Sequence, residues 1–456
     1  MATHSWGKEE RSLTSSQSNH QLPNILMIIT HDTGRHLGCY GRKVDTPNLD
    51  RLAEEGARFD SYFCPAPQCS PSRGSILTGR YPHINGLMGL AHLGFGLNPG
   101  EKTLPMFLRE AGYDTYLFGF QHEAQDPASL GYDHIAQVKW DHRAQTVAPQ
   151  VVDFLRNWRK ETPFFAMVGF TETHRPFDRP WYTSDDPDRV EVPPYLPDLP
   201  DIRRDIAEFQ GTVRAADDGV GLILEALDTR ELAENTLVIY TTDHGIAFPR
   251  AKGTLYDPGL ETALLMRWPG NIRPGSVYRE LLCNIDLLPT LLDIACIRAP
   301  ENLDGRSFLP LLRGLPYAGR ERLFCELTWH DLYRPMRGIR TRRYKFIRHF
   351  TQACGIYIPL DIHQGLSGRA VRQEFYSRPY VQEELYDLDK DPLEMENLIG
   401  DPAYQETVQE LRQVLEQWMR QTDDPLLSGH IRGQEAPGWE EERALGNLPR
   451  EAYFEG

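Results

Sequence analysis

Continuous apolar runs alternate with amphipathic stretches along the first two thirds of the chain. The run at 24–30 (NILMIIT) has no regular polar positions, which is typical of a strand buried on both faces of a sheet. Similar runs predict strands at 114–120, 163–170 and 236–242. Helices are predicted at 46–56, 103–111, 147–159 and 205–227. This alternation predicts an α/β fold with a mostly parallel central sheet flanked by helices.

The pattern changes after about residue 315. The segment 336–349 (MRGIRTRRYKFIRH) predicts antiparallel strands with a basic turn, 384–388 predicts another strand, and 404–421 predicts an amphipathic helix. These segments indicate a smaller α+β subdomain. We therefore predict a flexible N-terminal tail at 1–22, a large α/β domain at 23–315 and a C-terminal subdomain at 316–456.

The composition, with 40% hydrophobic and 25% charged residues, is that of a soluble globular protein. The 49 Lys and Arg against 65 Asp and Glu give a net charge of −16. This charge argues against sequence-independent nucleic-acid binding, which depends on neutralising phosphates. No apolar run approaches the roughly 18 residues of a membrane span, and the polar N-terminus lacks the apolar core of a signal peptide. We expect a cytoplasmic protein with no nucleic-acid or membrane partner.

Seven cysteines are scattered along the chain without the paired spacing of a structural zinc site. Their odd number favours reduced thiols, most of them packed as small apolar side chains. Cys69 differs because of the residues that follow it (QCSPSRGSILTG from 68 to 79). Ser70 can cap a helix and Pro71 can take its first position, so Cys69 would stand where an anion is favoured. Arg73 lies one helical turn on. A buried structural thiol and a nucleophile fit this pattern equally.

Acidic and imidazole side chains follow the four strands predicted in the first 245 residues. In open α/β sheets, ligands bind beyond the carboxyl ends of the strands, so we expect these side chains to gather in one place. Oxygen and imidazole ligands suit a divalent cation such as Ca²⁺, Mg²⁺ or Mn²⁺. The residues concerned are His31, Asp32, His122, His174, Asp243 and His244.

The motif C-x-P-S-R followed by L-T-G resembles the signature of the type I sulfatases, which belong to the alkaline phosphatase superfamily. The matching positions are Cys69, Pro71, Ser72, Arg73, Thr78 and Gly79. In that family the cysteine is oxidised to formylglycine before folding, and the aldehyde hydrate is the nucleophile. The resemblance extends over most of the chain and implies an alkaline phosphatase-like fold. Other segments that resemble sulfatases are 24–32, 46–56, 243–245, 255–259 and 384–398.

Further segments resemble the sulfamidases, the heparan N-sulfatases of that family. They are 85–90 (NGLMGL), 246–249 (IAFP), 335–337 (PMR) and 418–425. The resemblance implies hydrolysis of the N-sulfate of an amino sugar, or of a small sulfamate, with release of inorganic sulfate. Three alternatives stay open: a phosphonate monoester or phosphodiester hydrolase of the same superfamily, an O-sulfatase, and a catalytically silent carbohydrate-binding relative.

The resemblance places Asp32, Asp243, His244 and the modified Cys69 at metal-ligand positions. It implies one divalent metal, Ca²⁺ in most relatives. Many relatives have Asp-Asp at the first strand end and Asp-Asn at the second, whereas this chain has His31-Asp32 and Asp243-His244. Two imidazoles in place of oxygen ligands weaken the case for Ca²⁺ and admit Mn²⁺. His31 stays outside the predicted ligand set.

The resemblance also implies catalytic roles. Arg73 would orient the formylglycine hydrate, Lys252 would contact the sulfate, and His174 would protonate the leaving group. His122 would help to deprotonate the hydrate when sulfate is expelled.

The lysine that usually precedes the equivalent of His122 is missing, because Phe120 and Gln121 stand there. One sulfate-neutralising charge is therefore lost, or another residue supplies it.

The implied partners are a sulfated saccharide or small sulfated substrate and a formylglycine-generating enzyme during maturation, and a homo-oligomer stays open. Four basic side chains of the C-terminal part could reach an anionic substrate or could be solvated surface residues. They are His330, Arg334, Arg337 and His363.

Overall fold

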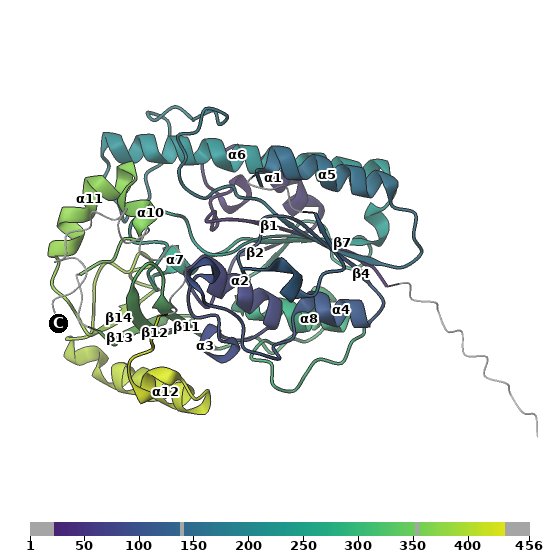
Figure 1. Cartoon of the computed structure of the whole chain (residues 1–456). Coiled ribbons are helices and arrows are strands. Elements are labelled where there is room, and N and C mark those ends of the chain that lie inside the picture. The colour runs from purple at the N-terminus through teal and green to yellow at the C-terminus, as the bar shows by residue number, and fades with distance from the viewer. Residues whose placement is uncertain (1–21, 137–140, 352–354, 434–456) are drawn as a thin grey trace, which may run out of the picture.

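The computed structural model describes residues 22–136, 141–351 and 355–433 (Figure 1). Residues 1–21 of the predicted tail, Cys354 and the chain beyond residue 433 lie outside the described residues. In the described part, no helix combines the length and the apolar character needed to cross a membrane. The first predicted strand is β1 (Asn24–Thr30), and all seven of its residues are buried.

β1 lies inside an eight-stranded sheet of order β5-β4-β6-β1-β7-β8-β2-β9. Seven strands run in the same direction, and β8 alone runs antiparallel to both of its neighbours. The predicted mostly parallel sheet is thereby confirmed. The strands are β2 (Ala57–Phe59), β4 (Asp114–Gly119), β5 (His134–Ala136), β6 (Phe164–Gly169), β7 (Thr236–Thr242), β8 (Leu264–Arg267) and β9 (Ser276–Tyr278).

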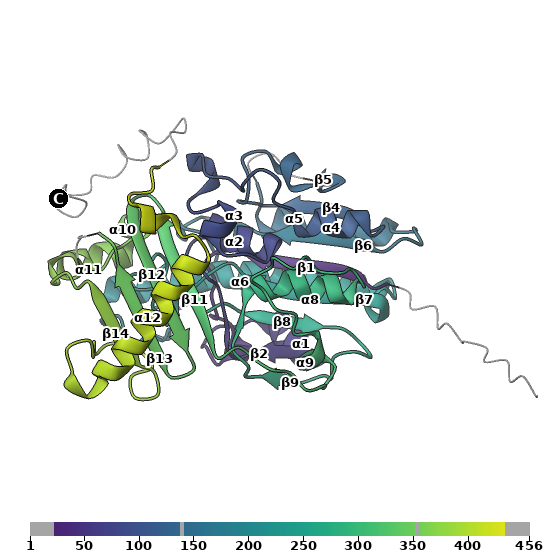
Figure 2. The same ribbon diagram turned by 90° about the horizontal axis from the view of Figure 1, so that it is seen from below.

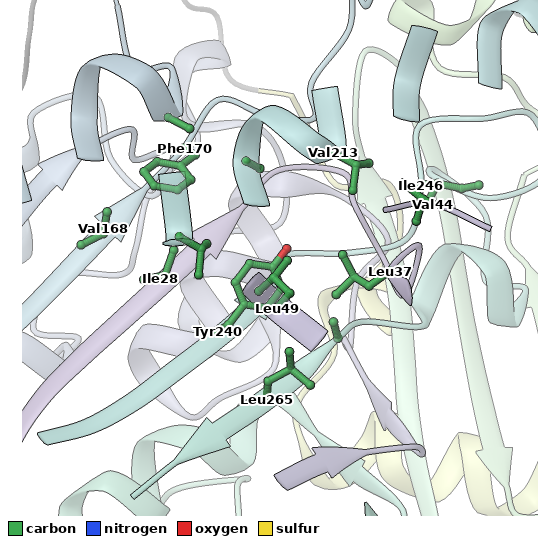
Figure 3. Packing of buried hydrophobic residues seen from close by; sticks show 14 of the residues in the cluster. Ile28, Leu37, Val44, Leu49, Val168, Phe170, Val213, Tyr240, Ile246 and Leu265 are labelled. Atoms are coloured by element: carbon green, nitrogen blue, oxygen red, sulfur yellow. The ribbon is translucent and has the colours of Figure 1, made fainter. Parts of the chain in front are cut away.

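Helices cover both faces of this sheet, as the period of two in β1 requires. Leu26 and Ile28 face one apolar cluster, whereas Ile25, Met27 and Ile29 face another. The helices of the first face are α1 (Pro47–Glu55), α5 (Ala144–Asn157) and α6 (Pro200–Thr229). Those of the second are α2 (Cys69–Thr78), α4 (Leu104–Glu110) and α8 (Leu287–Ile294). The two layers are seen in Figure 1, and Figure 3 shows the packing of the first cluster around Ile28 and Tyr240.

A second, antiparallel sheet follows in the C-terminal part, in the order β11-β12-β13-β14. The long amphipathic helix α12 (Gln405–Gln421) packs across it through Val408, Leu411, Leu415 and Trp418 (Figure 2). These are the apolar positions that the helical period predicts. The strands are β11 (Arg322–Trp329), β12 (Tyr333–Thr341), β13 (Tyr344–His349) and β14 (Glu383–Asp387).

Two helices between β13 and β14 return to the first sheet's layer. They are α10 (Leu360–His363) and α11 (Leu366–Ser377), and α11 packs against α6. Ile362, Val371 and Phe375 belong to the same buried cluster as β1 and α6. The predicted boundary at 315/316 stays a prediction, and the C-terminal part contributes directly to the core of the larger layer.

Arg337 is not placed as either sequence interpretation expected. It is neither solvated nor directed at a substrate: it is buried, and its Nε and Nη2 donate to the Asp424 carboxylate at 2.6 and 3.0 Å. His363 is also buried, and its Nδ1 lies 2.8 Å from the hydroxyl of Tyr376. Paired burial of this kind ties β12 to the chain that leaves α12.

Replacing Asp424 by Ala tests this pairing. The variant removes the nearer of two carboxylates beside a buried arginine and leaves only Glu326 Oε2, 3.6 Å from Nε, so we expect the free energy of unfolding to fall by about 3 kcal/mol. Urea unfolding would measure it. Glu301→Ala is the control, because the Glu301–Arg298 pair is almost fully exposed and should contribute nothing measurable. Equal stability of the two variants would contradict the assigned role.

Candidate active site

Cys69 lies at the very start of α2, because the helix begins two positions earlier than the sequence suggested. Gln68 is the N-cap and Cys69 the first helical residue, whereas Ser70 had been expected to cap. The Ser70 hydroxyl is used elsewhere: it accepts a hydrogen bond from the backbone N–H of Ala91 at 3.0 Å. Cys69 still stands at the helix N-terminus, where free N–H groups favour an anion.

The carboxyl ends of four parallel strands converge on Cys69. β1 is followed by His31 and Asp32, and β7 by Asp243 and His244. These four residues and Cys69 are buried, and each offers one ligand atom within 4.8 Å of all the others. The adjacency of β1 and β7 in the sheet explains why the two pairs meet.

The distances within this cluster suit a shared cation. His31 Nδ1 and His244 Nε2 lie 2.8 and 2.9 Å from Asp32 Oδ1. Asp243 Oδ2 lies 3.4 Å from His31 Nδ1, and Cys69 Sγ lies 3.9 Å from the same nitrogen. Ligands of one metal ion at ~2.0–2.5 Å from it are spaced in this way. His31, which was left out of the predicted ligand set, therefore lies among the other four.

The orientation of His244 supplies an independent test of the fit. Its Nδ1 lies 2.9 Å from the carbonyl oxygen of Gly245, so Nδ1–H donates there and Nε2 keeps its lone pair. Nε2 is buried and forms no hydrogen bond of good geometry among the described residues, but it faces Asp32 Oδ1 at 2.9 Å, so these two atoms are placed to share a cation. An imidazole fixed in this tautomer by a backbone carbonyl is the usual arrangement of a metal-bound histidine. The donor set therefore fits a divalent metal.

Cations balance the buried carboxylates. Burial alone would raise the pKa of Asp32, but Lys252 and His31 hold it well below its usual value. Burial likewise opposes ionisation of Cys69, yet His31 and Lys252 hold the pKa of the thiol well below its usual value. In the formylglycine form of residue 69, the nucleophilic oxygen would lie close to the position of Cys69 Sγ. The surroundings of residue 69 therefore favour a negative charge.

Arg73 is aimed into the same cluster. Its Nε donates to Asp243 Oδ2 at 2.9 Å, and its two terminal nitrogens are buried without a hydrogen-bond partner among the described residues. Buried guanidinium N–H groups normally have acceptors. The two free nitrogens therefore indicate that an anionic or polar ligand belongs beside Arg73.

Lys252 makes two buried ion pairs rather than one. Its Nζ lies 2.7 Å from Asp32 Oδ2 and 2.8 Å from Asp361 Oδ2. Asp361 was not found by sequence reasoning, because it belongs to α10, 109 residues away, and no motif marks it. Its other oxygen is buried and unpaired in the described structure.

His174 stands between this pair and the surface. Its Nδ1 lies 2.7 Å from the carbonyl oxygen of Arg175, and its Nε2 lies 4.0 Å from Asp361 Oδ2. Burial and the nearby Lys252 lower the pKa of His174. A cavity of about 510 Å³ opens beside Asp361, lined among others by Arg175, Phe177 and Arg369. Its size is within the usual range of small-ligand sites.

His122 completes the predicted set. It follows β4, and its ring lies 6.2 Å from the ring of His31. Burial lowers its pKa to about 4, although Cys69 opposes the fall. All the residues given catalytic or ligand positions by the sequence, namely Asp32, Cys69, Arg73, His122, His174, Asp243, His244 and Lys252, are thus gathered at one end of the sheet.

His330 and Arg334, the other two basic residues that could reach a substrate, lie outside the cluster around Cys69. His330 is buried, its Nδ1 lies 3.0 Å from Asp331, and its charge acts on Asp361. Arg334 packs its guanidinium over the ring of Tyr357.

Comparison with known proteins identifies this constellation. The family model described as "Sulfatase" matches residues 23–297, and the model described as "N-sulphoglucosamine sulphohydrolase, C-terminal" matches residues 247–365. The chain belongs to the sulfatase family. The family implies an enzyme that hydrolyses sulfate esters with a divalent metal and a formylglycine.

Individual relatives agree. The sulfatase is 30% identical to the N-sulphoglucosamine sulphohydrolase of Homo sapiens, over 89% of this chain and 91% of the relative. It is also 30% identical to an ulvan-active sulfatase of Formosa agariphila, over 92% and 84%. The structure of the phosphonate monoester hydrolase of Agrobacterium radiobacter has the same fold, with a TM-score of 0.70, 21% identity and coverage of 89% and 97%. The alkaline phosphatase-like fold is thereby confirmed.

Replacing Cys69 by Ala should abolish turnover and leave the fold intact, since the nucleophile is lost from a well-packed helix start. Cys69→Ser is a gentler probe, because a serine alkoxide could attack sulfur but could not eliminate sulfate. Steady-state kinetics and intact mass would be measured together. The active wild type should be lighter by about 18 Da, the change from cysteine to formylglycine.

Cys296→Ala is the matched control, because Cys296 is exposed and lies outside the site. It should keep both the mass difference and full activity. Full activity of Cys69→Ala would rule out residue 69 as the nucleophile.

Proposed function

We propose that this sulfatase hydrolyses the N-sulfate of an amino sugar, or of a small sulfamate, and releases inorganic sulfate. The observation that carries the proposal is the position of Asp361, whose carboxylate lies 4.0 Å from the imidazole expected to protonate the leaving group. Asp361 and Lys252 both fall within the segment matched by the N-sulphoglucosamine sulphohydrolase C-terminal model. The similarity to the human enzyme of that name supports the same conclusion.

The chemistry of the leaving group explains why this carboxylate matters. Cleavage of an S–N bond releases an amine, which takes up a proton and carries a positive charge near neutral pH. A carboxylate beside the donor favours that cation, whereas it does nothing for a neutral alcohol. The 510 Å³ cavity beside Asp361 has room for a sugar ring.

The residues divide the work in the following way. Asp32, Asp243, His244 and residue 69 would hold the metal, with His31 beside them, and when bound it supplies Lewis acidity at the sulfate oxygens. Formylglycine, made from Cys69 by a maturing enzyme, supplies the nucleophilic hydroxyl.

The cationic and imidazole side chains do the rest. Lys252 donates from Nζ to a sulfate oxygen, and Arg73 directs its two free nitrogens at the oxygens around residue 69. His174 carries the proton from Nε2 to the departing nitrogen.

O-sulfate hydrolysis is the second candidate, because the chain is also 30% identical to an ulvan-active sulfatase. A phosphodiester substrate is the third arm of the test, since the chain shares its fold with a phosphonate monoester hydrolase. The substrate panel below separates all three.

The substrate preference is tested by kcat/KM on N-sulfoglucosamine, glucosamine 6-O-sulfate and a phosphodiester. We expect the N-sulfate to be preferred by the formylglycine-containing wild type. Asp361→Asn should lower the ratio of N- to O-sulfate kcat/KM by about tenfold, equivalent to ~1.4 kcal/mol. Loss of the Lys252–Asp361 ion pair should lower kcat/KM on both substrates equally. A change in the ratio therefore reports the effect of Asp361 on the leaving group.

Asp218→Asn is the control, because Asp218 is exposed on α6. It should leave the ratio unchanged. A wild type that prefers the O-sulfate, or an Asp361→Asn ratio equal to that of the control, would contradict the proposal.

The metal is proposed to be Mn²⁺ rather than Ca²⁺, because two imidazoles lie in the ligand cluster. Protein dialysed against equal concentrations of both ions should retain Mn²⁺ when its metal content is measured. His244→Asn exchanges an imidazole for an amide oxygen and should shift the retained metal towards Ca²⁺. His134→Asn, on the exposed strand β5, is the control. Retention of Ca²⁺ by the wild type would overturn the assignment.

A further inference from the structure

We propose that His92 is a positioning residue for His122, a role that rests on the proposed formylglycine route. His92 accepts a hydrogen bond from Nε2–H of His122 and thereby leaves Nδ1 of His122 unprotonated beside residue 69. His122 can accept a proton from residue 69 only when its Nδ1 is unprotonated. His92 lies outside both the sulfatase signature at 68–79 and the sulfamidase-like segment at 85–90.

The contact between the two histidines is direct. His92 Nδ1 lies 2.8 Å from His122 Nε2, and the two rings are within 12° of parallel at a centroid distance of 5.0 Å. A neutral imidazole has one N–H and one lone pair, so this single contact decides which nitrogen of His122 carries the proton. If Nε2 of His122 carries the hydrogen, Nδ1 must carry the lone pair.

The backbone around His92 is held in place from the nucleophile's own helix. His92 lies in the short turn η2 (Ala91–Leu93), and the N–H of Ala91 donates to the hydroxyl of Ser70, the residue after Cys69. Ala91 and Leu93 are buried in a cluster that includes Cys69, whereas His92 between them is exposed. The backbone that carries His92 is therefore held in place relative to residue 69.

His122 is restrained on its other sides as well. Its backbone N–H donates to the Glu123 carboxylate at 2.6 Å, and its ring packs against Phe120 at 5.6 Å. Its Nδ1 is buried and has no hydrogen-bond partner among the described residues. Cys69 adjoins the ring and acts on its charge. The unpaired nitrogen is thus the one available to residue 69.

The geometry then assigns the proton's path. A hydroxyl of the residue-69 nucleophile gives its proton to Nδ1 of His122, and the electron pair of that O–H bond stays on the oxygen. Nε2–H of His122 stays bonded to His92 throughout, so the base is oriented by a third group, as in other nucleophile–base pairs. If His92 donated instead, Nδ1 of His122 would carry the hydrogen and could not accept one.

The tautomer can be read directly. Long-range ¹H–¹⁵N spectra of the full-length protein labelled with ¹⁵N-histidine, recorded at about pH 8, above the ordinary histidine pKa, distinguish Nε2–H from Nδ1–H. A His122→Gln spectrum assigns the signal among the 15 histidines. Wild type should show His122 as Nε2–H. His92→Leu, which has no acceptor, should shift His122 towards Nδ1–H, and His92→Gln, whose amide oxygen accepts, should restore Nε2–H.

Kinetics provide the second readout. For His92→Leu we expect kcat to fall about 10–100-fold with KM changed less than about twofold, since a base and not a substrate contact is affected. His92→Gln should recover to within about threefold of wild type. His134→Leu is the matched control, because His134 is another exposed histidine that packs on Tyr116 outside the site.

An Nδ1–H tautomer of His122 in wild type, or a His92→Leu variant with unchanged tautomer and kcat, would overturn the proposal. So would equal loss in the Leu and Gln variants, which would indicate a packing role only. The spectra need no substrate, so the result stands apart from the N- or O-sulfate preference. That preference is decided by the substrate panel alone.

Discussion

The burial of two carboxylates at the ends of adjacent strands is the constraint on which the rest of the site depends. Asp32 and Asp243 are fully buried, and the backbone N–H of Asp32 donates to Asp243 Oδ1 at 2.9 Å. Buried charges of one sign are costly unless cations are brought to them. Arg73 from α2 forms an ion pair with Asp243 at 2.9 Å, and Lys252 from the loop after β7 forms one with Asp32 at 2.7 Å. A metal ion between the carboxylates would do the same.

The second sheet holds the loop that carries one of these cations. Asp257 begins the short helix α7 (Asp257–Leu260), a few residues after Lys252. Arg340 of β12 and Lys345 of β13 both form ion pairs with Asp257, at 2.9 and 2.5 Å. The C-terminal part therefore supports the site twice, by fixing this loop and by delivering Asp361 from α10. Asp361 and the two residues that support the loop thus come from the same segment that matches the N-sulphoglucosamine sulphohydrolase model.

Histidine orientation is the second theme of the site. Backbone carbonyls fix His244 and His174 through Nδ1, and a neighbouring imidazole contacts His122. In each case a hydrogen bond on one nitrogen determines what the other nitrogen can do. Imidazoles a few ångströms apart in one site can therefore present different nitrogens to their surroundings, although they are chemically identical residues.

The sequence alone determined the parts of this protein that depend on local pattern. The apolar runs predicted β1, β4, β6 and β7, and the strand ends and the Cys69 motif predicted the site, because period and spacing are local properties. Short strands such as β2 and β5, three residues each, were missed since so few residues show no period. Only the tertiary structure decided the rest. Asp361 and His92 join the site, and Arg337 is buried away from any substrate, through tertiary contacts such as the one between Lys252 and Asp361, 109 positions apart. No local pattern encodes such contacts, because they exist only once the layers have packed.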